Sequence, residues 1–109
     1  MKIYDPRALA STATGQLNRA ATALVHDAAD ARIVLFRIES GQEVPVHTSP
    51  STVLLSIVAG SGIVAGAEGE RAVRAGDLVA YDPGESHGMR AGDEQLVIAA
   101  IIAPRPGTR

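Results

Sequence analysis

The sequence predicts an all-β fold in a single domain that spans residues 1–109. Short apolar runs rich in Val, Ile and Leu recur at intervals of roughly 8–12 residues, a spacing typical of sandwiches and barrels. Glycine and proline turns separate these runs. No stretch of about 10 residues or more has the apolar period of about 3.6 residues that marks an amphipathic helix, which excludes alternating strands and helices.

The first 29 residues are expected to form an N-terminal extension, a short turn or strand, ahead of a barrel core at about residues 30–103. Asp5 and Pro6 predict a short helical turn, as its N-cap and its first helical residue. Residues 11–15 then have the composition of a loop. Residues 20–26 suit a helix through their alanines and a strand through their Thr, Leu and Val, and both interpretations stay open.

The strands expected in the core cover residues 32–39, 52–59, 63–65, 71–74, 78–81 and 96–102. Glycines 41, 60, 76 and 84 end strands at points where a positive φ or a close backbone approach is needed. The runs at 52–59 and 96–102 are apolar at nearly every residue, so both of their faces should be covered. A second sheet layer or a partner subunit would provide this cover. Because long exposed apolar strands aggregate, we predict a homodimer.

Composition excludes several classes of protein. The formal net charge is −2, the basic residues are scattered and only three residues are aromatic, which argues against nucleic-acid binding. The absence of cysteine excludes disulfides, zinc fingers and thiol catalysis. Residues 1–10 lack the apolar centre of a signal peptide, and no run approaches the ~20 apolar residues of a membrane span. We therefore expect a cytoplasmic protein that does not contact membranes.

Two segments carry the candidate chemistry. The first begins at Gly41, reaches His47 after five residues and closes at Gly60, and the second leads from Gly76 through Pro83-Gly84 to His87. In this spacing the chain resembles the cupin family, over about residues 30–103. The resemblance implies a cupin-type double-stranded β-helix, the jelly-roll barrel of small RmlC-like bacterial cupins. It also implies a metal site that the family builds from three histidines and one carboxylate.

The departures from the family pattern weaken that metal site. Ser49 stands at the position of the second histidine, Val53 at that of the glutamate, and Asp82 at that of a proline. A catalytic metal site usually has three protein ligands, and non-haem iron oxygenases use two histidines and one carboxylate. The resemblance leaves only His47 and His87 as ligands, so at most a weakly bound divalent metal such as Fe, Mn, Ni or Zn is expected.

A third ligand could come from elsewhere in the chain. His26, Glu43 and Glu85 are the candidates, and the sequence places none of them beside the histidine pair. Glu85 falls in a Pro-Gly turn, where an acidic residue usually only solvates the loop. Arg37 interrupts an apolar strand, and it either points to solvent, forms a surface ion pair, or lines the pocket and holds an anion.

The residues expected to line a ligand pocket are His47, Ser49, Val53, His87 and Met89. Side chains two apart on a strand share a face, so Met89 should lie beside His87, and Pro45, His47 and Ser49 should lie together. Residues such as Val53, Leu55 and Ile57 should form an apolar floor.

This pocket predicts a small-molecule-binding cupin of unknown ligand with a weak or absent metal requirement. The role could be sensing, sequestration or mild acid–base chemistry by a neutral histidine. The alternative is a metal-dependent cupin enzyme, a dioxygenase or isomerase, that uses His47, His87 and an unidentified ligand. A structural or regulatory module without a ligand is the third class, and whether the chain is an enzyme stays open.

Overall fold

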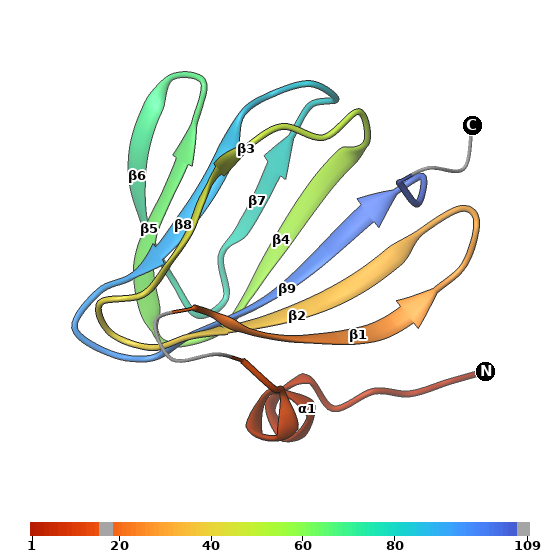
Figure 1. Cartoon of the computed structure of the whole chain (residues 1–109), viewed down its shortest axis with the longest axis horizontal. Coiled ribbons are helices and arrows are strands. Elements are labelled where there is room, and N and C mark those ends of the chain that lie inside the picture. The colour runs from red at the N-terminus through yellow and green to blue at the C-terminus, as the bar shows by residue number, and fades with distance from the viewer. Residues whose placement is uncertain (16–18, 107–109) are drawn as a thin grey trace.

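A computed structural model describes residues 1–15 and 19–106, and in this part the chain forms one short helix and two antiparallel sheets (Figure 1). In the described residues no helix has the length and apolar content that crossing a bilayer requires. The elements are α1 (Pro6–Thr12), β1 (Ala21–Asp27), β2 (Arg32–Ile38), β3 (Glu43–His47), β4 (Thr52–Ala59), β5 (Ser61–Gly66), β6 (Gly69–Arg74), β7 (Leu78–Tyr81), β8 (His87–Ala91) and β9 (Leu96–Ala103).

The two sheets face each other across an apolar interior (Figure 1). The larger sheet has the strand order β1-β2-β9-β4-β7, and the smaller one has the order β3-β8-β5-β6. The all-β prediction is confirmed. Residues 52–59 and 78–81 form strands with the predicted bounds, and the other predicted strands lie within one or two residues of theirs.

Two strands, β3 and β8, do not appear among the predicted apolar runs. Strand β3 contains Pro45 and β8 contains Gly88, and neither residue favours a strand interior. Proline is tolerated in β3 because this strand lies at the edge of the smaller sheet. Residues 20–26, left open between helix and strand, belong largely to β1, whose antiparallel pairing with β2 overrides the helix propensity of alanine.

The N-terminal helix begins as predicted. The Asp5 carboxylate accepts hydrogen bonds from the backbone N–H groups of Arg7 (3.1 Å) and Ala8 (3.3 Å), and Pro6 occupies the first turn. The helix extends to Thr12, so the prediction of loop from residue 11 is wrong by two residues. The hydroxyls of Ser11 and Thr12 donate to backbone carbonyls three residues earlier, which satisfies these side chains within the helix.

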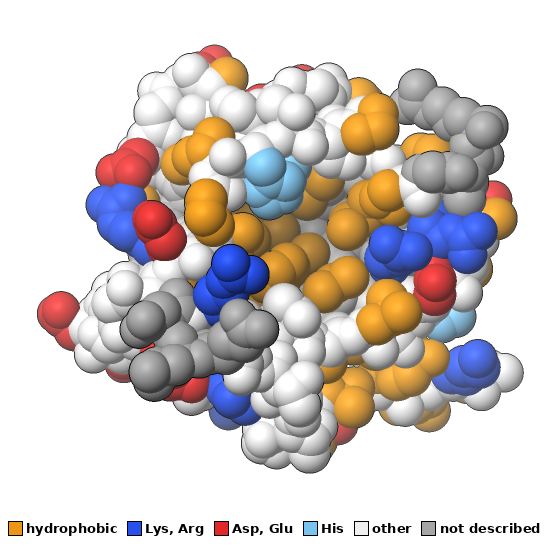
Figure 2. Space-filling model, in the orientation of Figure 1, with side chains coloured by type: hydrophobic (Ala, Val, Ile, Leu, Met, Phe, Trp, Pro, Cys, Tyr) orange, Lys and Arg blue, Asp and Glu red, His pale blue; other side chains and the backbone are white. Residues whose placement is uncertain are grey.

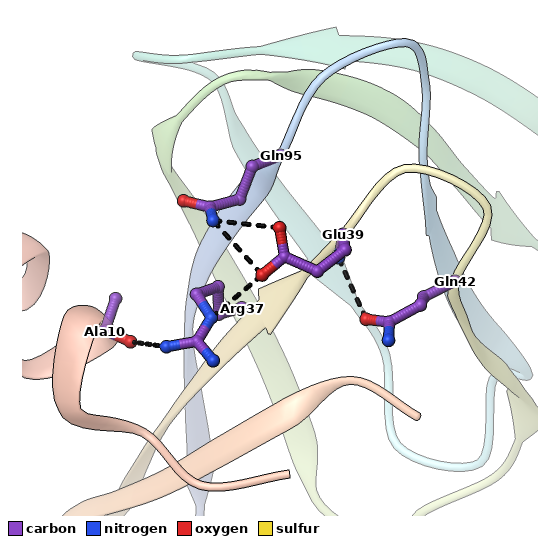
Figure 3. A network of polar contacts seen from close by, with 5 residues as sticks. All are labelled: Ala10, Arg37, Glu39, Gln42 and Gln95. Carbon is purple, nitrogen blue, oxygen red and sulfur yellow. Dashed lines mark hydrogen bonds and ion pairs between the residues drawn. The ribbon is translucent and has the colours of Figure 1, made fainter. Parts of the chain in front are cut away.

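Arg37 fastens this helix to the larger sheet (Figure 3). Its guanidinium donates to the carbonyl of Ala10 (2.6 Å) and pairs with the carboxylate of Glu39 (3.0 Å). Gln95 donates to both oxygens of the same carboxylate, and the side chain of Gln42 accepts from the Glu39 backbone N–H. The ion pair expected as one alternative for Arg37 is therefore present, and Arg37 does not line the cavity beside His47 and His87. The helix provides part of the cover expected for the outer face of β9.

Apolar side chains from the inner faces of both sheets form the core. From the larger sheet Leu55, Ile57 and Ile98 are at most 2% exposed. They pack in one cluster with Val64 and Met89 from the smaller sheet. Full burial of each such side chain contributes about 1.5–3 kcal/mol.

Gly60, at the turn between β4 and β5, satisfies both requirements expected of the strand-ending glycines. Its φ is +78°, in the left-handed region that side chains disfavour. A Cβ at this position would also lie only 1.8 Å from the carbonyl oxygen of Gln95. Gly41 has a similar φ of +85°, but nothing lies within 4 Å of the space where its Cβ would be.

We expect Gly60→Ala to destabilise the protein by about 1–3 kcal/mol more than Gly41→Ala. Both variants carry the left-handed backbone penalty of about 1–2 kcal/mol, whereas only Gly60→Ala overlaps another backbone atom. The free energies of unfolding are measured by urea denaturation of the wild type and the two variants. Equal losses in the two variants would contradict the close approach at Gly60.

Candidate functional site

A cavity of about 260 Å³ lies between the inner faces of the two sheets. Figure 2 shows an apolar hollow with a histidine side chain at its rim. The five predicted pocket residues all line this one cavity, namely His47, Ser49, Val53, His87 and Met89. The structure thus brings together residues that are up to 42 positions apart, from 47 to 89, in the sequence. That they hold a ligand stays a prediction.

The pairing of β3 with β8 places the two histidines opposite each other. His47 pairs with His87, and Val44 pairs with Met89. Three positions separate Val44 from His47, but only two separate Met89 from His87, so β3 contains an irregularity of one extra residue. Such bulges re-aim side chains, and this one turns His47 to the same face as Val44. Strict alternation would have sent these two side chains to opposite faces.

Because of the bulge, the prediction for the side chains around His47 is wrong in one respect. Pro45, His47 and Ser49 were expected to share a face, yet only His47 and Ser49 line the cavity. The reason is that the period of two does not hold through the bulge or past the end of β3 at His47. Met89 does share the cavity with His87, as the alternation along β8 predicts.

Both imidazoles are held in the same way. The Nδ1 atom of His47 lies 2.9 Å from the carbonyl oxygen of Pro45, and that of His87 lies 3.1 Å from the carbonyl oxygen of Glu85. A carbonyl oxygen only accepts, so each Nδ1 carries the proton. The ring centroids are 4.2 Å apart in an edge-to-face contact. His47 is exposed at the rim, whereas His87 is only 4% exposed.

The ring of Tyr81 packs against the ring of His87. The two ring centroids are 5.1 Å apart, and the phenol donates a 2.7 Å hydrogen bond to the carbonyl of Ala65. Burial raises the pKa of Tyr81 above its ordinary value of 10.0, and the charge of Glu85 raises it further. The phenol is therefore a neutral, fixed support for the His87 ring.

We expect the Tyr81 phenol to ionise with a midpoint above 10.0 in a Tyr4→Phe variant, which leaves Tyr81 as the remaining one of the two tyrosines. The raised pKa favours the protonated form in the folded state. Its stabilising contribution is therefore complete below about pH 10 and is lost as the pH rises through the folded pKa. Phenolate absorbance during a pH titration measures the midpoint.

The control is Tyr81→Phe in the wild-type background, which should flatten the alkaline loss of stability. This variant also removes the bond to Ala65, at about 0.5–1.5 kcal/mol near neutral pH. A Tyr81 midpoint at or below 10.0 would contradict the role of burial.

Two of the three positions that depart from the family pattern are those of missing metal ligands, and they lie in different surroundings. Val53 is 4% exposed on the inner face of β4, where its methyl groups form part of the cavity wall. Ser49 is half-buried, and its hydroxyl accepts from the backbone N–H of Ser51 (3.2 Å). The Ser49 carbonyl accepts from Gly84 (2.8 Å), which joins the two motif loops. Neither residue offers an anionic ligand.

The three candidates for a third metal ligand lie away from the cavity lining. His26 contacts Tyr4, whose hydroxyl is 3.2 Å from Nδ1 of His26. Glu43 lines a separate surface depression beside Arg90. The Glu85 carboxylate accepts from the backbone N–H of Asp82 in its own turn and from that of Ala67 in the turn between β5 and β6.

Several cavity residues were not predicted. Phe36, Ala100 and Ile102 line the cavity from β2 and β9, and Leu55 was expected there correctly. Ile57 was expected on the cavity floor, but it packs in the closed core instead. Alternation along β2 and along β9 predicts which residues of each strand share a face. Only the register between the two strands shows which of these residues reach the cavity.

Comparison with known proteins defines the class. A family model described as "Cupin domain" matches residues 34–102. Because this match spans more than half of the chain, the chain belongs to the cupin family, and its fold is the predicted cupin-type double-stranded β-helix. No curated protein is similar enough in sequence to match.

Solved structures agree on this fold. A protein from Thermus thermophilus has a TM-score of 0.87 and 24% identity over 97% of this chain and 100% of that one. An RmlC-like cupin from Desulfovibrio desulfuricans has 27% identity and a TM-score of 0.73 over 79% and 83% of the two chains. A predicted oxalate decarboxylase from Thermotoga maritima has 22% identity and a TM-score of 0.74 over 79% and 81%.

Proposed function

We propose that this chain binds a small organic molecule with an apolar body in the histidine cavity, without a tightly held metal ion. The observation that supports this proposal is the composition of the cavity wall. Phe36, Val53 and Ala100 present apolar surface, and His47 and His87 present ring nitrogens at one side. An apolar pocket with a few convergent polar groups is the usual form of a small-molecule site.

The position of Val53 strengthens the proposal. The family pattern has a glutamate there, and here the side chain is apolar, buried and directed into the cavity. A valine leaves no charge to balance a cation and makes the wall continuous with Leu55. Apolar contact with a ligand replaces the electrostatic role that a carboxylate would have.

We expect toluene, as an apolar probe, to shift the methyl resonance of Met89 in protein labelled at its methionine methyl groups. The chain has two methionines, and Met1 is fully exposed, so Met1 supplies an internal control. Binding to the native state should also raise the melting temperature. NMR titration and thermal unfolding measure the two effects.

The blocking variant is Val53→Phe, whose larger ring should fill the cavity and abolish the Met89 shift. The matched control is Leu78→Phe, at a residue that is 82% exposed on β7. If saturating toluene leaves the Met89 methyl unchanged in folded wild-type protein, the proposed function is wrong.

A metal-dependent cupin enzyme of the dioxygenase or isomerase type is the second candidate. One observation favours it: metal-binding histidines almost always donate their other ring N–H, as both Nδ1 atoms do here. The similar Thermotoga protein, a predicted oxalate decarboxylase, points the same way. The donor set does not fit, however, because no cluster of three metal-binding side chains occurs within residues 1–15 and 19–106.

We expect micromolar Fe, Mn, Ni or Zn salts to leave the melting temperature unchanged, because two neutral imidazoles hold a divalent cation only weakly. A ligand that binds only the native state must raise the melting temperature. Thermal unfolding with each salt is compared in the wild type and in His47→Phe. A rise in the wild type that His47→Phe removes, or one equivalent of metal in purified protein, would favour the enzyme.

The homodimer and the cytoplasmic location stay predictions. On the outer face of the larger sheet, α1 contacts β1 and β2 most closely. Towards the other edge, Leu54 is 39% exposed and Leu78 is 82% exposed. These exposed apolar side chains are the reason for still expecting a partner subunit. Helix α1 covers only part of the outer face of the larger sheet.

A further inference from the structure

We infer that the polar end of the ligand is a neutral hydrogen-bond donor, a pair of adjacent hydroxyl or N–H groups on a small ring, which the Nε2 atoms of His47 and His87 accept. This inference rests on the proposed function, since it names the ligand chemistry for the same cavity. It follows from the tautomer of the two rings, the surroundings of Nε2, the uncharged cavity wall and the cavity volume.

The backbone sets the tautomer. Each Nδ1 proton is donated to the carbonyl oxygen two residues earlier, Pro45 for His47 and Glu85 for His87. In a neutral imidazole the other nitrogen then carries a lone pair and no proton. Both rings therefore offer an acceptor at Nε2, and both rings line one cavity with their centroids 4.2 Å apart.

The Nε2 atom of His87 is open to the cavity. The ring is only 4% exposed, and no hydrogen bond to its Nε2 exists among residues 1–15 and 19–106. Yet within the same residues no enclosed side-chain nitrogen or oxygen lacks a partner. This nitrogen must therefore reach open space, and His87 lines the cavity.

The rest of the wall selects against charged ligands. Within the described part of the chain, the cavity-lining residues include no Lys, Arg, Asp or Glu. A carboxylate would bring its lone pairs against those of Nε2 with no cation to compensate for its desolvation. A hydroxyl or N–H group would instead satisfy an acceptor that is otherwise unpaired.

The volume limits the size of the ligand. About 260 Å³ corresponds to roughly nine water molecules at about 30 Å³ each, below the ~300–1,000 Å³ of drug-sized pockets. A single six-membered ring with two adjacent donors fits within this volume. Its apolar face would lie against side chains such as Phe36 and Val53.

The test compares three one-ring probes by calorimetry in oxygen-free buffer with chelator at neutral pH. Catechol has two adjacent donors, 1,2-dimethoxybenzene has the same ring without donors, and benzoate is an anion. We expect catechol to bind about tenfold more tightly than either of the others, since only catechol can donate hydrogen bonds to the two imidazoles.

The preference should fall in His47→Phe, at an exposed position that is expected to tolerate the change, and more strongly in His87→Phe if that variant folds. The matched control is His26→Phe, which removes a histidine outside the cavity lining and should keep the full preference. Melting temperatures establish that each variant is folded.

The outcomes separate the two proposals. If catechol binds no better than its dimethyl ether, or if benzoate binds best, the donor inference is wrong while the proposed function stands. The same holds if none of the three binds but toluene still shifts Met89. If toluene also fails, the proposed function itself falls.

Discussion

Leu55, Ile57 and Ile98 project from the middle of the larger sheet toward the smaller one, and this contact holds the two sheets together. The register of β4 against β9 places Ile57 opposite Ile98 in the closed core and Leu55 opposite Ala100 beside the cavity. Beyond Leu55, Val53 continues the apolar wall along β4, and His47 and His87 line the cavity from the smaller sheet.

The irregularity in β3 is the second constraint on the site. Without it, Val44 and His47 could not both face inward, because alternation sends side chains three apart to opposite sides. Val44 packs against the core, and His47 pairs with His87. One extra residue in the edge strand β3 thus allows Val44 to pack against the core and His47 to line the cavity.

The sequence allowed the fold to be predicted, and the five residues named for a pocket line one cavity, but the shape of that cavity could not be predicted. Apolar runs ended by glycine locate β4 and β7 to the residue, whereas β3 and β8 lack such runs because proline and glycine interrupt them. Phe36 and Ala100 reach the cavity through pairings between strands that are distant in the sequence. The bulge depends on the same long-range register, so alternation alone misplaced Pro45.

The contacts that hold the two histidines explain how both rings keep their orientation without the other metal ligands of the family pattern. Each ring is oriented by a carbonyl of its own segment, two residues earlier, and His87 also rests against Tyr81. Neither restraint involves the side chains of Ser49 and Val53. The absence of an acidic ligand therefore leaves both rings in place beside the cavity. The Nε2 atom of His87 reaches open space and has no hydrogen-bond donor within residues 1–15 and 19–106, so a ligand or a water molecule can donate to it. In the family pattern, two imidazoles and a carboxylate suit a cation. Here Val53 replaces the carboxylate, so the same two imidazoles favour a neutral hydrogen-bond donor.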